Sequence, residues 1–295
     1  MKETDVPDRA GPPAAARPRR LTPWRLVQSV TAGVLEHQSM GSAAQIAYYL
    51  LFATFPFLLT LASLLAFLPI PNLMDWLLGL LGAIVPSAAV DLMRDSVERL
   101  VTRQRSGLLS VGIVVSVWAA ANAVEAFMQS LNRVYGLREH RPFWQTRGIA
   151  LLLSVGVSIF TVLGLLALWF GSQVSHWWAA RGGFGPLPVQ VWDGARWPLV
   201  LVFLIGAIDQ LYFIGPAARQ RWRWVTPGAV VAVLGWVAAS LGFSAYVRHF
   251  GAYNATYGSI GAMIILLTWM YLTAFFALLG AEINAMTGET GDGPP

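Results

Sequence analysis

The chain has 295 residues, of which 56% are hydrophobic and only 12% are charged, with a formal net charge of +5 and no cysteine. A soluble domain carries about 25% charged residues, so this chain has too few to cover a surface that faces water. The composition therefore indicates a membrane protein. It excludes disulfides, thiolate catalysis and cysteine-ligated zinc or iron–sulfur sites.

Residues 1–23 are rich in Pro, Ala and Arg and contain no apolar stretch. This composition predicts a disordered basic tail, and it argues against a cleaved signal peptide. Residues 24–37 then repeat apolar side chains every three or four positions, from Trp24 to Val34. That spacing predicts a short amphipathic helix on the cytoplasmic surface of the membrane.

The first predicted span covers residues 41–68 and has Pro56 near its middle, where it should kink the helix. The next apolar stretch, residues 73–85, is too short to cross a bilayer, so we expect it to be interfacial or re-entrant. Residues 86–103 place apolar side chains on one helical face and charged side chains on the other. They predict an amphipathic helix outside the bilayer.

The later part of the chain holds the other spans, each near the roughly 20 residues that a bilayer requires. They cover residues 107–131, 148–171, 197–215, 225–247 and 258–286. Pro, Gly and Trp cluster at 177–198, which predicts a longer loop in the headgroup region. The expected fold is therefore all-α, a polytopic bundle of about six transmembrane helices with interfacial amphipathic helices, over residues 24–287. Residues 288–295 form a short polar tail.

The positions of the basic residues predict the orientation. With the N-terminus inside, 13 of the 20 Lys and Arg residues fall on inner segments and 7 on outer segments. Basic residues favour the cytoplasmic side, so both ends should be cytoplasmic. The basic residues lie between spans and do not form one stripe, which argues against nucleic-acid binding. A single lysine among abundant Ala, Gly and Val indicates a high-GC bacterial source, and hence a bacterial cytoplasmic membrane.

One face of the second span carries four polar side chains at spacings of three or four residues. They are Asn122, Glu125, Gln129 and Asn132. A carboxylate within a span is costly, so this face should point into the bundle or a wet cavity. Two interpretations stay open at this point: the side chains tie helices together, or they line a pathway for a solute or a proton.

Two further acids lie within spans, Asp209 in the fourth and Glu282 near the end of the sixth. In the predicted topology both lie in the cytoplasmic half, at a depth similar to that of Glu125. If the three acids converge, they form a cation or proton site, or pair with Arg133 or Arg147. Alternatively each reaches the headgroup region by itself, most readily Glu282.

Signals for catalysis are weak. The four histidines are scattered over both sides of the membrane without metal-ligand spacing, which argues against a zinc or two-metal hydrolase. No Walker A sequence is present. Ser116 or Ser259 could supply a nucleophile, but no histidine lies within a span to activate it. We therefore expect no enzyme, no catalytic residue, no metal and no cofactor.

The end of the chain carries the most specific pattern, with TYGSIGA at 256–262, LTWMYL at 267–272 and LGAEIN at 279–284. In these segments the chain resembles the YihY/virulence factor BrkB family of bacterial inner-membrane proteins, once labelled ribonuclease BN. The segments at 47–56 and 132–135 support the resemblance, which extends over nearly the whole chain.

The resemblance implies six spans, cytoplasmic ends and a transporter-like role in the cell envelope. It also marks matching positions that serve either function or helix packing: Tyr257, Gly258, Ser259, Gly280, Glu282 and Asn284. We expect a membrane transporter or lipid translocator whose partners are membrane lipids and an unidentified small-molecule or lipid substrate. Whether it forms a homo-oligomer stays open. The alternative is a non-transporting envelope scaffold that uses residues 86–103 and the Trp-rich loop to contact lipid or a partner.

Overall fold

The computed structural model describes the helical part of the chain. The described residues are 23–67, 90–91, 94, 106–180, 186–218, 225–249 and 252–287. Within them, only the backbone is described for 23, 59–67, 106–111, 169–180, 186–193, 248–249 and 252–259.

Seven helices account for most of the described residues, and no strand occurs among them. In chain order they are α1 (Pro23–Glu36), α2 (Ser39–Phe67), α5 (Ser106–Val134), α6 (Phe143–Ala180), α7 (Pro186–Ile214), α8 (Pro227–His249) and α9 (Ala252–Met286). The predicted all-α class is confirmed.

Six of these helices, α2 and α5 to α9, are long and apolar enough to cross a membrane. Their candidate spans are Ser39–Leu58, Gly112–Val134, Phe143–Leu168, Gly194–Ile214, Pro227–Val247 and Ile260–Met286. Each predicted span falls on one of them. The predicted number of about six spans is therefore confirmed, and α2 continues as a helix through Pro56.

The longer loop predicted at 177–198 is wrong. Helix α6 continues to Ala180 and α7 begins at Pro186, so most of the segment is helical. Proline is well tolerated at the first position of a helix, where its missing N–H costs no hydrogen bond. Membrane helices also accept an internal proline such as Pro198 more readily than soluble helices do.

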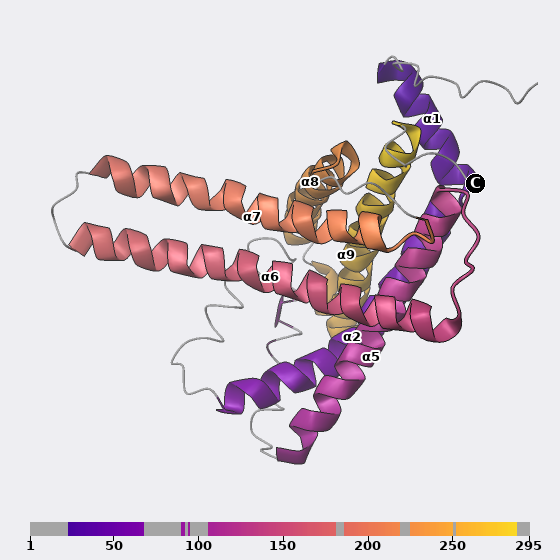
Figure 1. Ribbon diagram of the computed structural model, residues 1–295. Helices are drawn as coiled ribbons and strands as arrows, with labels where there is room; N and C mark the ends of the chain where they lie inside the picture. Colours follow the sequence, from indigo (N-terminus) through magenta and orange to yellow (C-terminus); the bar gives the residue numbers. More distant parts are fainter. Residues whose placement is uncertain are drawn as a thin grey trace, which may run out of the picture.

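The helices pack mainly in pairs. Helix α6 packs against α7, α8 against α9, and α2 against both α5 and α9. Figure 1 shows α6 and α7 running side by side as a long hairpin whose far ends stand away from the other helices. Helix α9 contacts α1, α2, α5 and α8, and it therefore occupies the centre of the bundle.

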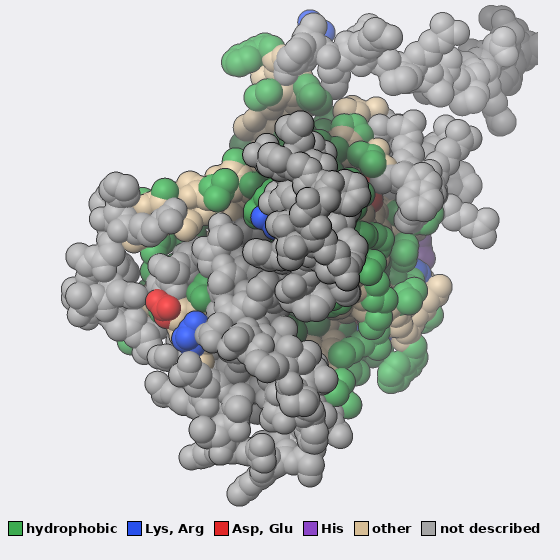
Figure 2. Space-filling model, turned by 90° about the vertical axis from the view of Figure 1, so that its left-hand side faces the viewer, with side chains coloured by type: hydrophobic (Ala, Val, Ile, Leu, Met, Phe, Trp, Pro, Cys, Tyr) green, Lys and Arg blue, Asp and Glu red, His purple; other side chains and the backbone are tan. Residues whose placement is uncertain are grey.

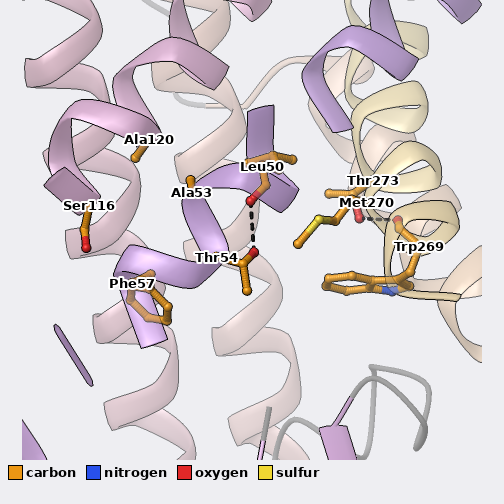
Figure 3. Close-up of a pocket in the computed structure, with 9 residues that line it drawn as sticks. All are labelled: Leu50, Ala53, Thr54, Phe57, Ser116, Ala120, Trp269, Met270 and Thr273. Carbon is orange, nitrogen blue, oxygen red and sulfur yellow. Dashed lines mark hydrogen bonds between the residues drawn. The ribbon is translucent and has the colours of Figure 1, made fainter. Parts of the chain in front are cut away.

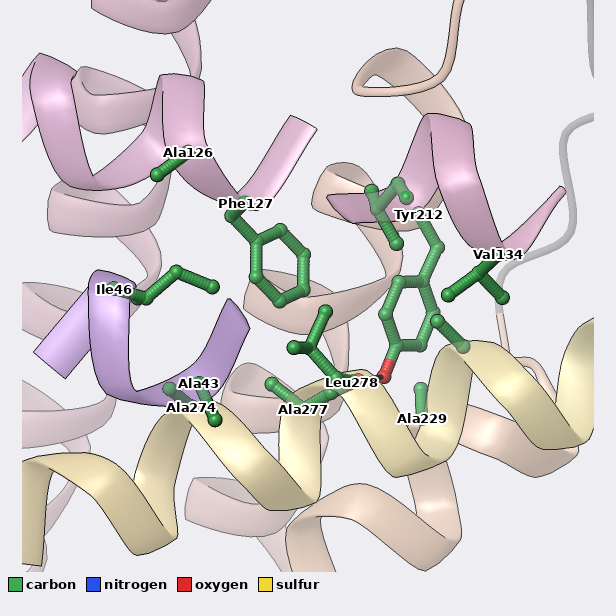
Figure 4. Close-up of a cluster of buried hydrophobic side chains, with 12 residues drawn as sticks. Ala43, Ile46, Ala126, Phe127, Val134, Tyr212, Ala229, Ala274, Ala277 and Leu278 are labelled. Atoms are coloured by element: carbon green, nitrogen blue, oxygen red, sulfur yellow. Dashed lines mark hydrogen bonds between the residues drawn. The ribbon is translucent and has the colours of Figure 1, made fainter. Parts of the chain in front are cut away.

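A cluster of buried apolar side chains lies where α2, α5, α7, α8 and α9 meet (Figure 4). Half of its twelve members are alanines, which allow helix backbones to approach closely. The rings of Phe127 and Tyr212 stack with their centroids 6.4 Å apart. The Tyr212 hydroxyl donates a hydrogen bond to the Ala277 carbonyl, which joins α7 to α9 inside the core.

The outer surface of the spans is apolar. Val114 of α5, Leu152 of α6 and Val202 of α7 are each more than half exposed. Figure 2 shows a described surface on which hydrophobic side chains are frequent and charged ones are few. Large exposed apolar patches of this kind mark a membrane-facing surface.

Helix α1 confirms the helix predicted at 24–37, and its apolar side chains are partly buried and partly exposed. Val30 and Val34 are buried, and α1 packs against the end of α9. Trp24, Val27 and Leu35 are more than half exposed. The helix therefore also presents apolar side chains to its surroundings.

Several predicted segments lie outside the described residues, in whole or in large part. They are the tail at 1–22, the stretch at 73–85, most of 86–103 and the polar tail from 288. Within 86–103, Val90 is buried in a cluster with Ala47, Leu266 and Met270, whereas Asp91 is exposed.

Candidate functional site

Arg147, near the start of α6, is 5% exposed and joins α6 to α5. Its Nη1 donates to Oδ1 of Asn122 at 2.7 Å and to Oε2 of Glu125 at 3.2 Å. Its Nη2 donates to the carbonyl of Trp118 at 2.9 Å, and the guanidinium lies 3.9 Å from the centroid of that indole ring. The permanent charge of Arg147 therefore compensates Glu125. In the described part of the chain, pairing with Arg147, one of the alternatives for the acids within the spans, is observed for Glu125 alone.

Glu282, in α9, faces the junction of α1 and α2. Nδ1 of His37 lies 3.0 and 3.1 Å from its two carboxylate oxygens, and Ser39 donates from Oγ to Oε1 at 2.8 Å. The Glu282 side chain is 0% exposed. The interpretation that Glu282 reaches the headgroup region is therefore wrong, because α1 and the first turn of α2 cover it. Gly33 makes this possible, since a Cβ there would lie 2.7 Å from Oε2 of Glu282.

Asp209, in α7, belongs to a third set of partners at the start of α8. Its carboxylate accepts hydrogen bonds from the Thr226 hydroxyl at 2.6 Å and from the Thr226 backbone N–H at 3.3 Å. Asn284 of α9 donates to the same hydroxyl and accepts from the N–H of Gly228. Thr226 also accepts from the N–H of Ala229, as an N-cap residue does. These bonds connect α7, α8 and α9.

Asn132 lies at the end of α5 and contacts two loops. It donates to Glu139 at 2.9 Å and accepts from the backbone N–H of Ala217 at 2.7 Å. Arg141 donates to both oxygens of Glu139 and to the carbonyl of Gly215. The hydrogen bond from Arg141 holds the pKa of Glu139 below its usual value of 4.5, although partial burial acts in the opposite direction.

The polar face predicted on the second span is therefore divided. Asn122 and Glu125 face α6, Asn132 faces the loops, and Gln129 between them is exposed. The expectation that all four side chains point into the bundle is wrong for Gln129, which is exposed although Met128 and Ser130 beside it are buried.

The three acids within the spans do not converge. Among the described contacts, Glu125, Asp209 and Glu282 share no hydrogen-bond partner. Arg133, the other predicted partner, donates instead to the hydroxyls of Ser42 and Ser130. In the part of the chain that the structure describes, no three His, Asp or Glu side chains are placed to hold a metal ion.

The sequence reasoning missed His37, Ser39 and Thr226 as partners of the buried acids. Only Thr226 had a local signal, because a threonine followed by Pro227 is a typical start of a helix. His37 and Ser39 lie 245 and 243 positions from Glu282 in the chain, so no local pattern connects them.

Two apolar grooves lie on the outer side of these helices. The first has a volume of ≈ 320 Å³ between α2, α5 and α9 (Figure 3). It is lined by Leu50, Ala53, Thr54, Phe57, Ser116, Ala120, Trp269, Met270 and Thr273. The second, of ≈ 410 Å³, lies between α2, α5 and α6 and shares Phe57, Ser116 and Ala120 with the first.

The polar atoms of these grooves are largely satisfied within their own helices. The hydroxyls of Thr54, Ser116 and Thr273 each donate to the carbonyl four residues earlier. Several lining residues, such as Phe57 and Ile159, are more than half exposed, so the grooves open toward the surroundings of the bundle.

A sequence model of the family described as virulence factor BrkB matches residues 30–294. The chain belongs to the virulence factor BrkB family. It is 37% identical over 254 residues to a Bacillus subtilis protein named as ribonuclease-like, YfkH, and the match covers 85% of this chain and 90% of that protein.

Other relatives of this BrkB-family chain carry the name UPF0761 membrane protein. One from Tolumonas auensis is 27% identical over 84% of this chain and 80% of its own length. One from Chromohalobacter salexigens is 29% identical over 86% of this chain and 60% of its own length. No solved structure matches the chain.

The closing pattern that suggested the BrkB family lies along α9. Glu282 and Asn284 belong to the hydrogen-bonded sets described above, and Gly280 faces the backbone of Gly228 in α8. Tyr257 and Ser259 lie in the first turns of α9, where only the backbone is described, as at Gly258. At Gly280, Glu282 and Asn284, this BrkB-family chain therefore connects α9 to its neighbours.

Proposed function

We propose that this BrkB-family chain is a lipid translocator of a bacterial cytoplasmic membrane and carries out no catalytic step. The observation that carries the proposal is the pair of apolar grooves on the outer side of α2, α5, α6 and α9. Six helices place these grooves within the thickness of a bilayer, where the surrounding molecules are lipid acyl chains.

The chemistry of the grooves favours an acyl chain over an ion or a sugar. Their lining is mainly aliphatic and aromatic, and the hydroxyls of Thr54, Ser116 and Thr273 already donate to carbonyls of their own helices. Their volumes lie in the range of about 300–1,000 Å³ that ligand sites in proteins occupy.

A polar pair lies beside the part of α5 that lines the second groove. Arg147 donates to the carbonyl of Trp118, and Val117 and Ala120, within two residues of Trp118, line the groove. Glu125 is paired with the same guanidinium. We propose that a lipid with its acyl chain in the groove has its headgroup on the side of this pair.

The hydrogen bonds of the three acids within the spans favour a lipid as the substrate over a small solute that is transported together with an ion. Each of Glu125, Asp209 and Glu282 already has hydrogen-bond partners from a neighbouring helix or from the segment next to it. A wet ion pathway would need acids that face a common cavity.

For the orientation, we propose that both ends are cytoplasmic. The excess of Lys and Arg on the inner segments supports this, at 13 against 7. The Arg147–Glu125 pair, the Asp209 set and the Glu282 set then all lie toward the cytoplasmic side.

The alternative is a non-transporting scaffold of the cell envelope. The exposed apolar side chains of α1, Trp24, Val27 and Leu35, favour it because they suit contact with a lipid surface or a partner. A scaffold would be damaged more by substitutions at 90–100 than by changes in the grooves.

The test is lipid translocation by the purified full chain in liposomes that contain a fluorescent phospholipid. We expect faster loss of outer-leaflet asymmetry than in empty liposomes, and Ala120→Phe should remove most of the added rate because its ring fills both grooves. Val231→Phe is the matched control, since Val231 is exposed on α8 and lines neither groove.

Two results would overturn the proposal. Liposomes with correctly folded protein that translocate lipid no faster than empty ones would exclude lipid translocation. Equal rates for the wild type and Ala120→Phe would exclude the grooves as the pathway.

A further inference from the structure

Glu282 differs from Glu125, the ion-paired acid of α5, in the nature of its partner. Glu125 is paired with Arg147, whose charge is permanent. The described partners of Glu282 are the imidazole of His37 and the hydroxyl of Ser39, and neither carries a permanent charge. Histidine is the side chain that changes its charge near neutral pH. The charge balance at Glu282 therefore depends on a proton.

Because the Glu282 carboxylate is buried, its stability depends on that proton. Its side chain is 0% exposed, whereas that of His37 is 22% exposed. A buried carboxylate is stable only when it is paired with a positive charge or protonated. One proton on the His37–Glu282 pair meets this requirement. Its loss leaves a buried carboxylate whose partners, a neutral imidazole and the Ser39 hydroxyl, carry no positive charge. The exposed part of the imidazole gives the proton a route to water.

This pair also joins α1 to the bundle. His37 follows the last residue of α1, and Glu282 lies in α9, so the hydrogen bond spans two separate elements. Gly33 of α1 lies against the same carboxylate. The buried apolar side chains of α1 are Val30 and Val34, while Trp24, Val27 and Leu35 are exposed. Helix α1 is therefore held by its packing against α9 and α2 and by the contacts at Glu282.

The connection between α1 and α2 is suited to a movement. Gln38 has a φ of 54°, a left-handed conformation that is uncommon for a residue other than glycine. Such a conformation persists only when the surrounding structure fixes both sides of it. If α1 separates from α9, Gln38 can relax to an ordinary conformation.

We propose that His37 and Glu282 form a proton-binding site that holds α1 against α9 when protonated and releases it when the proton is lost. The ligand is the proton itself, shared by the imidazole and the carboxylate. The inference is independent of lipid translocation.

Other charged groups on the described elements at this site are few. Glu36, at the end of α1, is exposed, and Arg133 of α5 donates to the hydroxyls of Ser42 and Ser130. Helix α2 contains no ionisable residue except its tyrosines, and Glu282 is the one acidic or basic residue of α9. None of these groups replaces the proton as the partner of the carboxylate.

The test is a distance measurement across the contact between α1 and α9. The chain has no cysteine, so spin labels can be placed at Thr31→Cys and Thr287→Cys, which are both exposed. In the full chain in nanodiscs, we expect one short distance below about pH 6 and a growing population of longer distances above about pH 8. The ratio of the two populations should change by up to about tenfold per pH unit.

Two variants separate proton binding from a merely structural contact. Glu282→Gln removes the buried charge, so α1 should stay close to α9 at every pH. His37→Gln removes the imidazole of the pair, so the ratio should no longer change between about pH 6 and pH 8. A control pair, Leu234→Cys with Ile264→Cys, reports on α8 and α9 and should not respond to pH.

Three results would overturn the proposal. The first is a wild-type distance that is constant from about pH 5 to pH 9. The second is a pH response that persists in Glu282→Gln or, should that variant fail to fold, in His37→Gln. The third is an equal response in the control pair, which would show that the whole bundle changes and not α1 alone.

Discussion

At Gly280 the missing side chain lets α9 approach the start of α8. A Cβ at this position would overlap with the carbonyl oxygen of Gly228 and the hydroxyl of Tyr212, and it would lie 2.8 Å from the Cβ of Ala232. A Cβ at Gly228 would in turn overlap with the carbonyl of Gly280. Backbone atoms cannot rotate away as a long side chain can, so both positions require glycine.

We therefore predict that Gly280→Ala lowers the free energy of unfolding by about 1–3 kcal/mol, the usual cost of overpacking. The measurement is thermal unfolding in detergent, followed by tryptophan fluorescence. Gly242→Ala is the matched control, because nothing lies within 4 Å of a Cβ at that position. Alanine favours a helix over glycine, so the control should be neutral or slightly stabilised. Equal melting temperatures for the two variants would contradict the packing argument.

At the scale of elements, the loop after α5 connects the ends of two spans. Helix α5 ends at Val134 and is followed by Gly136 at a φ of 64°, and the N–H of Leu137 donates to the carbonyl of Asn132. This is the Schellman arrangement, which favours glycine at the left-handed position. The loop then places Glu139 and Arg141 so that Arg141 reaches the carbonyl of Gly215, directly after α7. The ends of α5 and α7 are thus held together by an ion pair within the loop.

This loop predicts a pH dependence of stability. The hydrogen bond from Arg141 lowers the pKa of Glu139 in the folded protein below the usual carboxyl pKa of 4.5. The stabilisation that the ionised Glu139 gives the fold is therefore complete above pH 4.5, and it is lost as the pH falls through the lower pKa of the folded protein. Glu139→Gln should therefore be less stable than the wild type at neutral pH, and the difference should shrink below about pH 4. Melting temperatures of both proteins at a series of pH values would check this. A difference that grows on acidification would contradict it.

At the scale of the whole molecule, the amino-acid composition of the core differs from that of a soluble protein, and so does the composition of the outer surface. The core at the centre of the bundle is rich in alanine, whereas the large apolar side chains point outward. Lipid offers apolar surroundings on the outside, so close backbone packing and buried polar contacts hold the helices together. The same exterior carries the grooves in which we place the lipid.

The orientation of the whole molecule can be tested with cysteine labels, because the chain has no cysteine of its own. We predict that Gly183→Cys, between α6 and α7, reacts with a membrane-impermeant maleimide in intact cells. Arg138→Cys, between α5 and α6, should react only after the cells are permeabilised. The reverse pattern would place both ends outside and overturn the proposed topology.

The sequence by itself determined the six spans, the all-α class and the family of this protein. A bilayer requires about 20 apolar residues per helix and leaves the backbone no partner except itself, so spans can be recognised along the chain. The loop predicted at 177–198 failed because proline and glycine, which end helices in water, are tolerated in membrane helices.

Only the tertiary structure decided which partner each buried acid has. The sequence placed Glu125, Asp209 and Glu282 at a similar depth, but the rotation and neighbours of each helix separate them into three sets. His37 meets Glu282 across 245 positions of the chain. The grooves likewise exist only where three helices meet. Such contacts depend on how the helices pack against one another, and the apolar pattern of each span specifies its length but not the helix that will face it.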